Sequence, residues 1–158
     1  MIGAFAVGKT SLVQRFVTSL FSEKYHTTIG VKVDKKKVHV DGETVHLLIW
    51  DIHGDDPQQP LSSSYIRGAS GYLLVADGTR KETLDTTYCL ETKVKKIIGE
   101  VPFVLLLNKS DLTQQWEIKP EDEAELKQKE WTYFITSAKS GDGVENAFQI
   151  LTRKILIG

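Results

Sequence analysis

Apolar residues recur along the chain at two spacings, one typical of helices and one typical of strands. Positions three or four residues apart predict helices at about 11–21, 57–66, 81–98, 120–129 and 144–155. Alternating or unbroken apolar runs predict strands at about 31–40, 44–50, 71–77, 101–107 and 131–136. The run at 101–107 is apolar almost throughout, which indicates a central strand covered on both faces.

The order of these elements predicts the fold class. Asp41-Gly42 is a strong two-residue hairpin signal, so the first two predicted strands should pair in an antiparallel way. Their apolar positions change parity between Val31 and Val40, and we therefore expect a bulge or a break across the lysines at 35–37. The remaining strands alternate with helices. This pattern predicts a three-layer α/β fold, with an open, mostly parallel sheet that has one antiparallel edge and helices on both faces.

Composition limits the size and the partners of this fold. The chain has 158 residues, so we expect residues 1–158 to form a single domain. Its net charge of −1 produces no overall field that would attract nucleic acid or an anionic membrane. No apolar run approaches the roughly 20 residues that span a bilayer. Cys89 is the only cysteine, which excludes an intrachain disulfide, and we expect a cytoplasmic monomer.

The segment Gly3–Thr10 matches a phosphate-binding loop, in which two glycines five residues apart are followed by lysine and a hydroxyl residue. Backbone N–H groups of such a loop converge on phosphates, Lys9 adds positive charge, and the Thr10 hydroxyl can bind Mg²⁺. The loop also needs a preceding strand as support, yet only Met1 and Ile2 come before it. Either most of the first strand lies upstream of this sequence, or a central piece of the sheet is missing and the domain should be weak, and we favour the first hypothesis.

Three further motifs follow predicted strands. Asn108-Lys109-Ser110-Asp111 follows the central strand, and Asp111 can accept from the two adjacent donors of guanine, whereas adenine presents an acceptor there. Ser137-Ala138-Lys139 follows the last strand, where the Ala138 N–H can meet the guanine oxygen. Asp51 suits an indirect contact with Mg²⁺, and the Gly54 N–H can bond the terminal phosphate.

Taken together, these motifs resemble those of small GTPases of the Ras superfamily, most closely the Rab branch. The resemblance covers almost the whole chain, because five motifs occur in the order and spacing of the family. They are Gly3–Thr10, Thr28–Val31, Ile49–Asp51 with Gly54, Asn108–Asp111 and Ser137–Lys139. The resemblance implies a P-loop GTPase fold that binds GTP or GDP with Mg²⁺ and hydrolyses GTP.

The resemblance also implies roles for individual residues. The nucleotide-binding residues are Gly3, Phe5, Ala6, Val7, Gly8, Lys9, Thr10, Ser11, Phe21, Tyr25, Thr28, Gly54, Asn108, Lys109, Asp111, Ser137, Ala138 and Lys139. The Mg²⁺ contacts are Thr10, Thr28 and Asp51, and the catalytic residues are Thr28, Gly54 and Asp55. Phe21 corresponds to the aromatic residue that leans on the guanine, and Tyr25 to one that can cover the phosphates.

One segment departs from the family pattern. Typical members read Trp-Asp-Thr-Ala-Gly-Gln-Glu, whereas this chain reads Trp50-Asp51-Ile52-His53-Gly54-Asp55-Asp56 and lacks the glutamine that orients the attacking water. Asp55 adds negative charge beside a triphosphate, so we expect slow hydrolysis, although one of its oxygens can still accept from water. His53 either contributes a donor or points at solvent. Phe5 stands where a small residue is usual, and it either obstructs an arginine from an activating partner or stacks away from the phosphates.

The expected function is a guanine-nucleotide switch for signalling or trafficking, which binds effectors, exchange proteins and activating proteins through nucleotide-dependent loops. The alternative is a scaffold that holds GTP or GDP and does not cycle. Asn108–Asp111 disfavours a third reading, an ATP-using enzyme. Peripheral membrane association would require a tail beyond Gly158, since no carboxyl-terminal cysteine precedes that residue. The histidines at 26, 39 and 46 are too dispersed to indicate a metal site.

Overall fold

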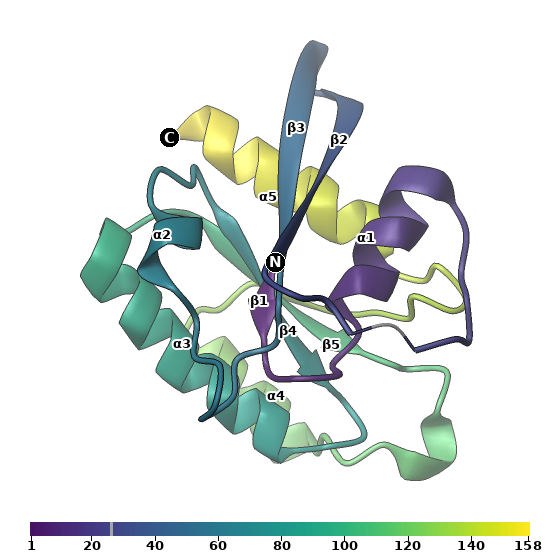
Figure 1. Ribbon diagram of the computed structural model, residues 1–158. Coiled ribbons are helices and arrows are strands. Elements are labelled where there is room, and N and C mark those ends of the chain that lie inside the picture. The colour runs from purple at the N-terminus through teal and green to yellow at the C-terminus, as the bar shows by residue number, and fades with distance from the viewer. Residues whose placement is uncertain (26) are drawn as a thin grey trace.

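The computed structural model describes residues 1–25 and 27–158, so His26 lies outside the described residues. Helices and strands alternate along the chain as the sequence predicts (Figure 1). The elements are β1 (Ile2–Gly3), α1 (Lys9–Thr18), β2 (Val31–Val40), β3 (Glu43–Ile52), α2 (Ser63–Ile66), β4 (Tyr72–Asp77), α3 (Glu82–Ile98), β5 (Phe103–Asn108), a 3₁₀ turn (Thr113–Gln115), α4 (Pro120–Gln128), β6 (Tyr133–Ile135) and α5 (Val144–Ile157).

Four strands form a parallel sheet in the order β1-β4-β5-β6, with β4 and β5 at its centre. The predicted mostly parallel α/β sheet is thus confirmed. The antiparallel pair β2–β3 differs in one respect from the expected edge, because it forms a two-stranded sheet of its own. Strand β1 has only two residues, and both pair with β4. The Met1 nitrogen still donates to the Trp50 carbonyl oxygen (2.8 Å), so β3 lies beside β1.

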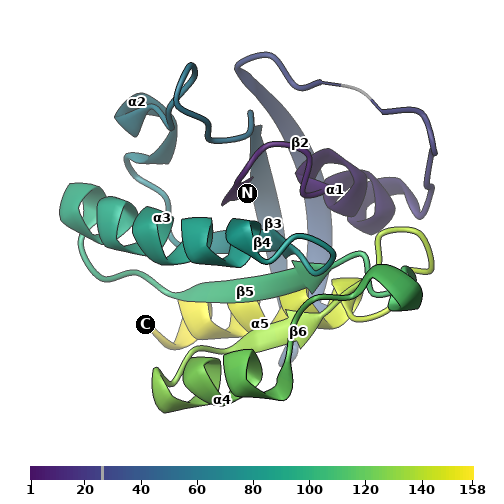
Figure 2. The ribbon, with the colours of Figure 1, turned by 90° about the horizontal axis from the view of Figure 1, so that it is seen from below.

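Helices cover both faces of the parallel sheet (Figure 1, Figure 2). Helices α1 and α5 pack on one face, against inward residues such as Val75 and Leu106. Helices α3 and α4 pack on the other face, against their neighbours Leu74 and Leu105. Since successive strand residues point to opposite faces and both faces are covered, the central strands are apolar without interruption. The three predicted layers are confirmed.

The β2–β3 hairpin is regular along its whole length. Every residue of Val31–Val40 has a partner in Glu43–Ile52, so the predicted bulge or break is wrong. The reason is that Lys36 occupies an inward position, with its ammonium 4.1 Å from the centre of the Phe16 ring. A lysine whose stem lies over an aromatic ring fits a half-apolar face, and no change of register is needed. The Asp41-Gly42 turn has positive φ at both residues, 51° and 84°, as its hairpin type requires.

Two helices are shorter than the apolar spacing predicts. Helix α1 ends at Thr18 because Ser19 adopts a left-handed conformation (φ 59°), and Leu20 is therefore 62% exposed. The segment 57–66 contains one helical turn, Ser63–Ile66, since Pro57 and Pro60 interrupt the backbone donors before it. Within the described residues, no helix is both long and apolar enough to cross a membrane.

The contact between α1 and α5 yields a stability prediction. The rings of Phe16 and Phe148 stack at 3.8 Å between centroids, and both residues are buried. Phe148→Ala should lower the free energy of unfolding by about 3–5 kcal/mol because it leaves a cavity between the helices. Phe148→Leu, which fills most of that space, should cost about 1–2 kcal/mol. Urea unfolding measures both, and an alanine loss below about 1 kcal/mol would contradict this view of the core.

Candidate functional site

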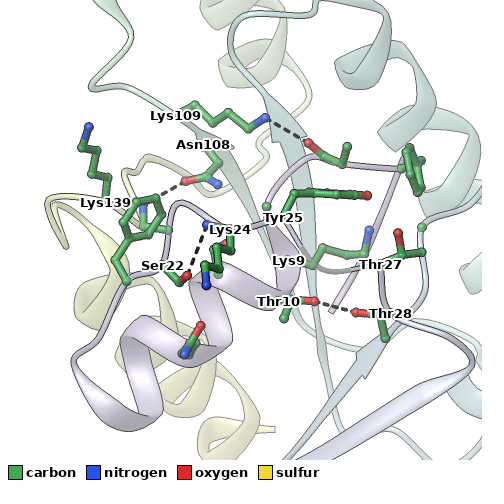
Figure 3. Close-up of a pocket in the computed structure, with 18 of the residues that line it drawn as sticks. Lys9, Thr10, Ser22, Lys24, Tyr25, Thr27, Thr28, Asn108, Lys109 and Lys139 are labelled. Atoms are coloured by element: carbon green, nitrogen blue, oxygen red, sulfur yellow. Dashed lines mark hydrogen bonds between the residues drawn. The ribbon is translucent and has the colours of Figure 1, made fainter.

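A cavity of about 370 Å³ lies where the parallel strands β1 and β5 end. Its walls come from the loop between β1 and α1, residues 21–25, 27 and 28, the segment after β3, and the loops that follow β5 and β6. Figure 3 looks into this cavity, with Lys9, Thr10 and Thr28 on one side and Asn108 and Lys139 on the other. The fold therefore brings the predicted motifs together around one space.

The loop before α1 has the backbone of an anion-binding turn. Ala6 (φ 60°) and Gly8 (φ 99°) are left-handed, and the helix begins at Lys9 directly after them. Position 8 requires glycine for a second reason, because a Cβ there would lie 2.4 Å from the Asn108 Nδ2. Among the described residues, no side chain caps this end of α1. Its first N–H groups and the positive end of its dipole are left for an anionic ligand.

Lys9 lies beneath this loop and is buried. Its Nζ donates to the carbonyl oxygens of Gly3 (3.1 Å) and Ala4 (2.9 Å). Burial lowers the pKa of Lys9 to about 8, although the nearby carboxylate of Asp51 opposes that change. An ammonium has three donors, so one remains for a ligand. An anion at this point would compensate the unfavourable burial of the charge.

Three oxygen-bearing side chains meet beside Lys9. The Thr10 hydroxyl donates to the Asp51 Oδ2 (2.7 Å), and the Thr28 hydroxyl lies 2.7 Å from the Thr10 oxygen (Figure 3). Since the Thr10 proton goes to Asp51, Thr28 is the donor in the second bond. Burial raises the pKa of the Asp51 carboxyl, and its Oδ1 is buried without a partner among the described residues.

This oxygen cluster fits Mg²⁺. The ion binds proteins through a few hydroxyl or carboxylate oxygens and keeps its other positions for water and substrate phosphates. The unpaired Asp51 oxygen and the two hydroxyls offer such oxygens next to the phosphate-binding loop. Elsewhere in residues 1–25 and 27–158, no group of three or more His, Cys, Asp or Glu side chains could hold a metal by itself.

Asn108 joins the loop before α1 to the loops on the other side of the cavity. Its side chain is buried at the end of β5. The Nδ2 donates to the Val7 carbonyl oxygen (3.0 Å), and the Oδ1 accepts from the Ala138 N–H (3.3 Å) and the Thr136 hydroxyl (3.3 Å). One carboxamide thus fixes the distance between two parts of the cavity wall.

Two cations hold the same loop and share one buried carboxylate. The Lys109 Nζ donates to the Ala6 carbonyl oxygen (3.0 Å; Figure 3) and lies 2.8 Å from the Asp77 Oδ2. Arg80 donates to the Phe5 carbonyl oxygen (2.8 Å) and to the Asp77 Oδ2 (3.1 Å). Asp77 is 1% exposed. Its carboxylate therefore orients both side chains that bind the loop.

The other end of the cavity carries a fixed carboxylate. The Asp111 Oδ1 accepts from the Ser137 hydroxyl (2.7 Å). Arg15 donates to the carbonyl oxygens of Ala138 (2.7 Å) and Lys139, which holds the loop that faces Asp111. Asp111, Ala138 and Lys139 all line the cavity. A carboxylate accepts only, so this end suits a ligand with adjacent N–H donors, as on the edge of guanine.

Aromatic side chains border the opening of the cavity. Phe5 and Tyr25 contact each other edge to face, with 5.8 Å between ring centroids, and both line the cavity. Phe21 also lines it and is half-buried. Phe5 and Tyr25 remain 44% and 59% exposed, so they form the outer rim of the wall.

The segment after β3 packs tightly against the loop before α1. At Gly54, a Cβ would lie 2.4 Å from the Phe5 Cα, so only glycine fits. The preceding residue, His53, is 5% exposed and lines the cavity. Its backbone N–H donates to the Gly30 carbonyl oxygen (2.9 Å), which joins this segment to the one that carries Thr28.

Asp55 has a different orientation from the one that a catalytic carboxylate needs. Its N–H donates to the Gly3 carbonyl oxygen (2.9 Å), but its Oδ1 accepts from the Leu61 N–H (2.6 Å) and lies 3.9 Å from the Lys93 Nζ. The structure does not bring the Asp55 carboxylate into the cavity wall.

Most of the predicted site residues line the cavity. These are Phe5, Ala6, Gly8, Lys9, Thr10, Ser11, Phe21, Tyr25, Thr28, Gly54, Asn108, Lys109, Asp111, Ala138 and Lys139. The others, Gly3, Val7, Asp51, Asp55 and Ser137, do not. Gly3 and Val7 contribute carbonyl oxygens that orient Lys9 and Asn108, and Asp51 and Ser137 bond the lining residues Thr10 and Asp111.

Sequence reasoning missed several lining residues. They are Gln14, Ser22, Glu23, Lys24, Thr27, Ile52, Asp56, Gln59 and Leu112. Gln14 lies four residues after Thr10 on α1, a helical spacing that could have identified it. Ser22, Glu23, Lys24 and Thr27 lie between the predicted residues Phe21 and Thr28. Asp56 and Gln59 have no sequence signal, because a turn that closes between them brings them to the wall.

Comparisons with known proteins find relatives that match almost the whole chain. A family model described as the Ras family matches residues 1–157. The chain is 36% identical to Ras-related protein RABA1c of Arabidopsis thaliana, over 97% of this chain and 72% of that protein. It is 36% identical to Ras-related protein Rab11E of Lotus japonicus, again over 97% and 72%, and 35% identical to Ras-related protein Rab-4 of Dictyostelium discoideum, over 99% and 77%.

The shared carboxylate yields a prediction for pH. Burial alone would raise the pKa of Asp77, but hydrogen bonds from Lys109 and Thr79 outweigh it, so the pKa lies below its ordinary value of 3.8. A carboxyl group whose pKa is lower in the folded state stabilises the fold at any pH above its unfolded-state pKa. This stabilisation is lost as the pH falls through the folded-state pKa. Asp77→Asn should therefore cost about 1–3 kcal/mol near pH 7 and progressively less towards about pH 3.

Urea unfolding of the wild type and Asp77→Asn between about pH 7 and pH 3 measures this difference. Asp85→Asn changes an exposed aspartate of α3 and serves as the matched control, with little effect at any pH. If the free energies of unfolding of the wild type and Asp77→Asn differed by the same amount at every pH, the role of the charged carboxylate would be contradicted.

Proposed function

Since this chain belongs to the Ras family of small GTPases, we propose that it is a Rab-like guanine-nucleotide switch that binds GTP or GDP with Mg²⁺ and hydrolyses GTP slowly. One observation carries the proposal: Lys9 and Asp111 line two parts of a single cavity of about 370 Å³, and Asn108 ties those parts together. A purine nucleotide has matching chemistry, with an anionic tail at one end and a hydrogen-bonding edge at the other.

At the base end, the Asp111 carboxylate accepts from the two adjacent N–H groups of guanine, and the Ala138 region receives the ring carbonyl. Ser137 holds Asp111 in place for this contact (2.7 Å). Adenine would present an acceptor to the carboxylate, and its buried polar groups would be left unpaired. The same site therefore rejects adenine nucleotides.

At the phosphate end, the amides at the start of α1 and the Lys9 ammonium bind the phosphates. Thr10 and Thr28, with Asp51 behind them, would hold Mg²⁺, whose charge would offset that of the phosphates. These side chains already share a hydrogen-bonded arrangement (Thr10 to Thr28 and to Asp51, both 2.7 Å), so little rearrangement is needed for oxygen ligands to surround the ion.

The switch acts through the segments that carry Thr28 and Gly54. In the GTP state both residues contact the terminal phosphate, and these contacts order the two segments. After hydrolysis the contacts are lost and the segments relax. The bond from the His53 N–H to Gly30 (2.9 Å) couples the two segments, which supports a joint response.

The surface next to Thr28 is suited to binding a partner protein that distinguishes the ordered from the relaxed state of these segments. Ile29 (87% exposed) and, on the hairpin, the cross-strand pair Val33 and Trp50 expose apolar side chains, as does Leu48. Exposed apolar residues that gather in one area are typical of protein-interaction surfaces. We assign this surface to effectors or regulators in membrane trafficking, by analogy with the Rab-named relatives.

A second candidate function is a scaffold that holds its nucleotide and does not cycle. The orientation of Asp55 favours it, because the carboxylate accepts from the Leu61 N–H and leaves no side chain of residue 55 in the cavity. Nucleotide binding is the same in both candidates, and only release of the γ-phosphate separates them.

Base recognition can be tested with inosine diphosphate, which lacks only the amino group of guanine. Displacement of fluorescent GDP in the presence of Mg²⁺ should show about 10- to 100-fold weaker binding of IDP than of GDP by the wild type. Asp111→Ala should bring the two affinities close together, whereas Asp85→Ala on α3 should keep the preference. Equal affinities in the wild type would contradict this reading of the site.

Hydrolysis can be tested in a single turnover of bound GTP. The wild type should release phosphate more slowly than a Ras-family protein with the glutamine, for which the unassisted rate is about 10⁻⁴ per second. Asp55→Gln removes the charge that Lys93 attracts, so the longer amide side chain is released to reach the cavity. There it can both accept from water and donate to a phosphate, which should raise the rate severalfold, and Asp85→Gln is the control. Absence of phosphate release over many hours would establish the scaffold instead.

A further inference from the structure

The segment after β3 lacks the glutamine of typical family members, but it contributes another polar residue to the cavity wall that is placed for GTP hydrolysis. Between Asp51 and Gln59, the lining residues whose side chains carry hydrogen-bonding atoms are His53, Asp56 and Gln59. The Asp56 Oδ1 is occupied, because it accepts from the N–H groups of Gln58 (2.7 Å) and Gln59 (2.9 Å). The side chain of Gln59 is exposed on a turn. His53 is buried, which distinguishes it from both.

Four contacts fix the position of His53. Its N–H bonds Gly30 (2.9 Å), and its ring lies edge-on to the Tyr65 ring at 6.3 Å between centroids. The next residue, Gly54, packs against the Phe5 backbone so closely that no Cβ fits. The ring nitrogen Nδ1 lies 3.1 Å from the Gly54 carbonyl oxygen. A side chain held in this way is pre-organised, unlike one on an exposed turn.

The last contact assigns the proton on the imidazole. A carbonyl oxygen only accepts, so Nδ1 carries the hydrogen and donates it to Gly54. In the neutral ring, Nε2 then has its lone pair free to accept. Within residues 1–25 and 27–158 this Nε2 has no hydrogen-bond partner, and the residue that carries it lines the cavity.

We propose that His53 orients the attacking water for GTP hydrolysis through its Nε2, in the place of the absent glutamine. This inference rests on the proposed function. The water donates a hydrogen bond to Nε2 while its oxygen forms a bond to the γ-phosphorus. The bond between that phosphorus and the bridging oxygen breaks, GDP leaves with the electron pair, and the proton of the water ends on the released phosphate. His53 therefore fixes the geometry of the water and keeps no proton.

The test compares three substitutions in the full chain. His53→Phe keeps a planar ring against Tyr65 but removes the acceptor, whereas His53→Gln keeps an acceptor on a flexible side chain. Gln59→Ala removes the other amide of the wall. Gln58→Ala, which removes an exposed amide outside the cavity wall, is the matched control. Each variant is measured for GDP affinity, thermal unfolding and single-turnover release of phosphate from bound GTP.

The expected result is a loss of about tenfold in the hydrolysis rate of His53→Phe, with GDP affinity unchanged, and a rate within about threefold of wild type in His53→Gln. Gln58→Ala should match the wild type. If His53→Phe fails to bind GDP, His53→Leu takes its place in the comparison. A failure of the wild type to bind GDP would instead overturn the proposed function, and this inference with it.

Three outcomes would overturn the role of His53 alone. The first is a wild-type rate when His53 is replaced by phenylalanine. The second is an equal loss in His53→Phe and His53→Gln, which would show that the residue acts through packing. The third is a loss in Gln59→Ala that exceeds the loss in His53→Phe, which would assign the water to the amide of the turn.

Discussion

The Asn108 carboxamide is the contact on which the cavity depends. It lies at the end of β5, in the centre of the sheet, and bonds the Val7 carbonyl oxygen on one side and the Ala138 N–H on the other. Because an amide group has a donor and an acceptor in fixed positions, one side chain can set the spacing of two loops. Because the carboxamide is buried, each of these hydrogen bonds has to be kept, since an unpaired polar group inside the protein is unfavourable. The loop before α1 and the loop after β6 are therefore joined through one buried side chain.

The opposite wall of the cavity is built differently. The segments with Thr28 and with His53 and Gly54 are joined to each other by the backbone bond between His53 and Gly30, and to the phosphate-binding loop by close packing at Gly54. The segment with Thr28 has no buried side chain among its described residues from 21 to 30, and it exposes Tyr25 and Ile29. A segment with this composition can order or relax at low cost, whereas the Asn108 side of the cavity cannot. This division suits a protein whose ligand is held firmly at one end and sensed at the other.

Much of the fold and the site could be predicted because both are encoded locally. The covered strands appear as unbroken apolar runs, and the anion loop requires Gly8 at a left-handed position next to Asn108. The failures have a common cause, which is contact between distant residues. Lys36 lies inward because the Phe16 ring accepts its stem and charge, and no pattern within the hairpin indicates that. The Asp55 carboxylate turns to Leu61 and Lys93, which local chemistry could not foresee.

The sequence by itself determined the order of the elements and identified most of the motifs that meet at the cavity, since both depend on short-range spacing and on the chemistry of single side chains. Only the tertiary structure decided which of the polar residues after β3 line the cavity. Asp55 and His53 both lie within three residues of the end of β3, yet the Asp55 side chain bonds a neighbouring turn and His53 lines the cavity. The physical reason is that a side chain's direction at the end of a strand is set by the partners that pack against it, and these come from elsewhere in the chain.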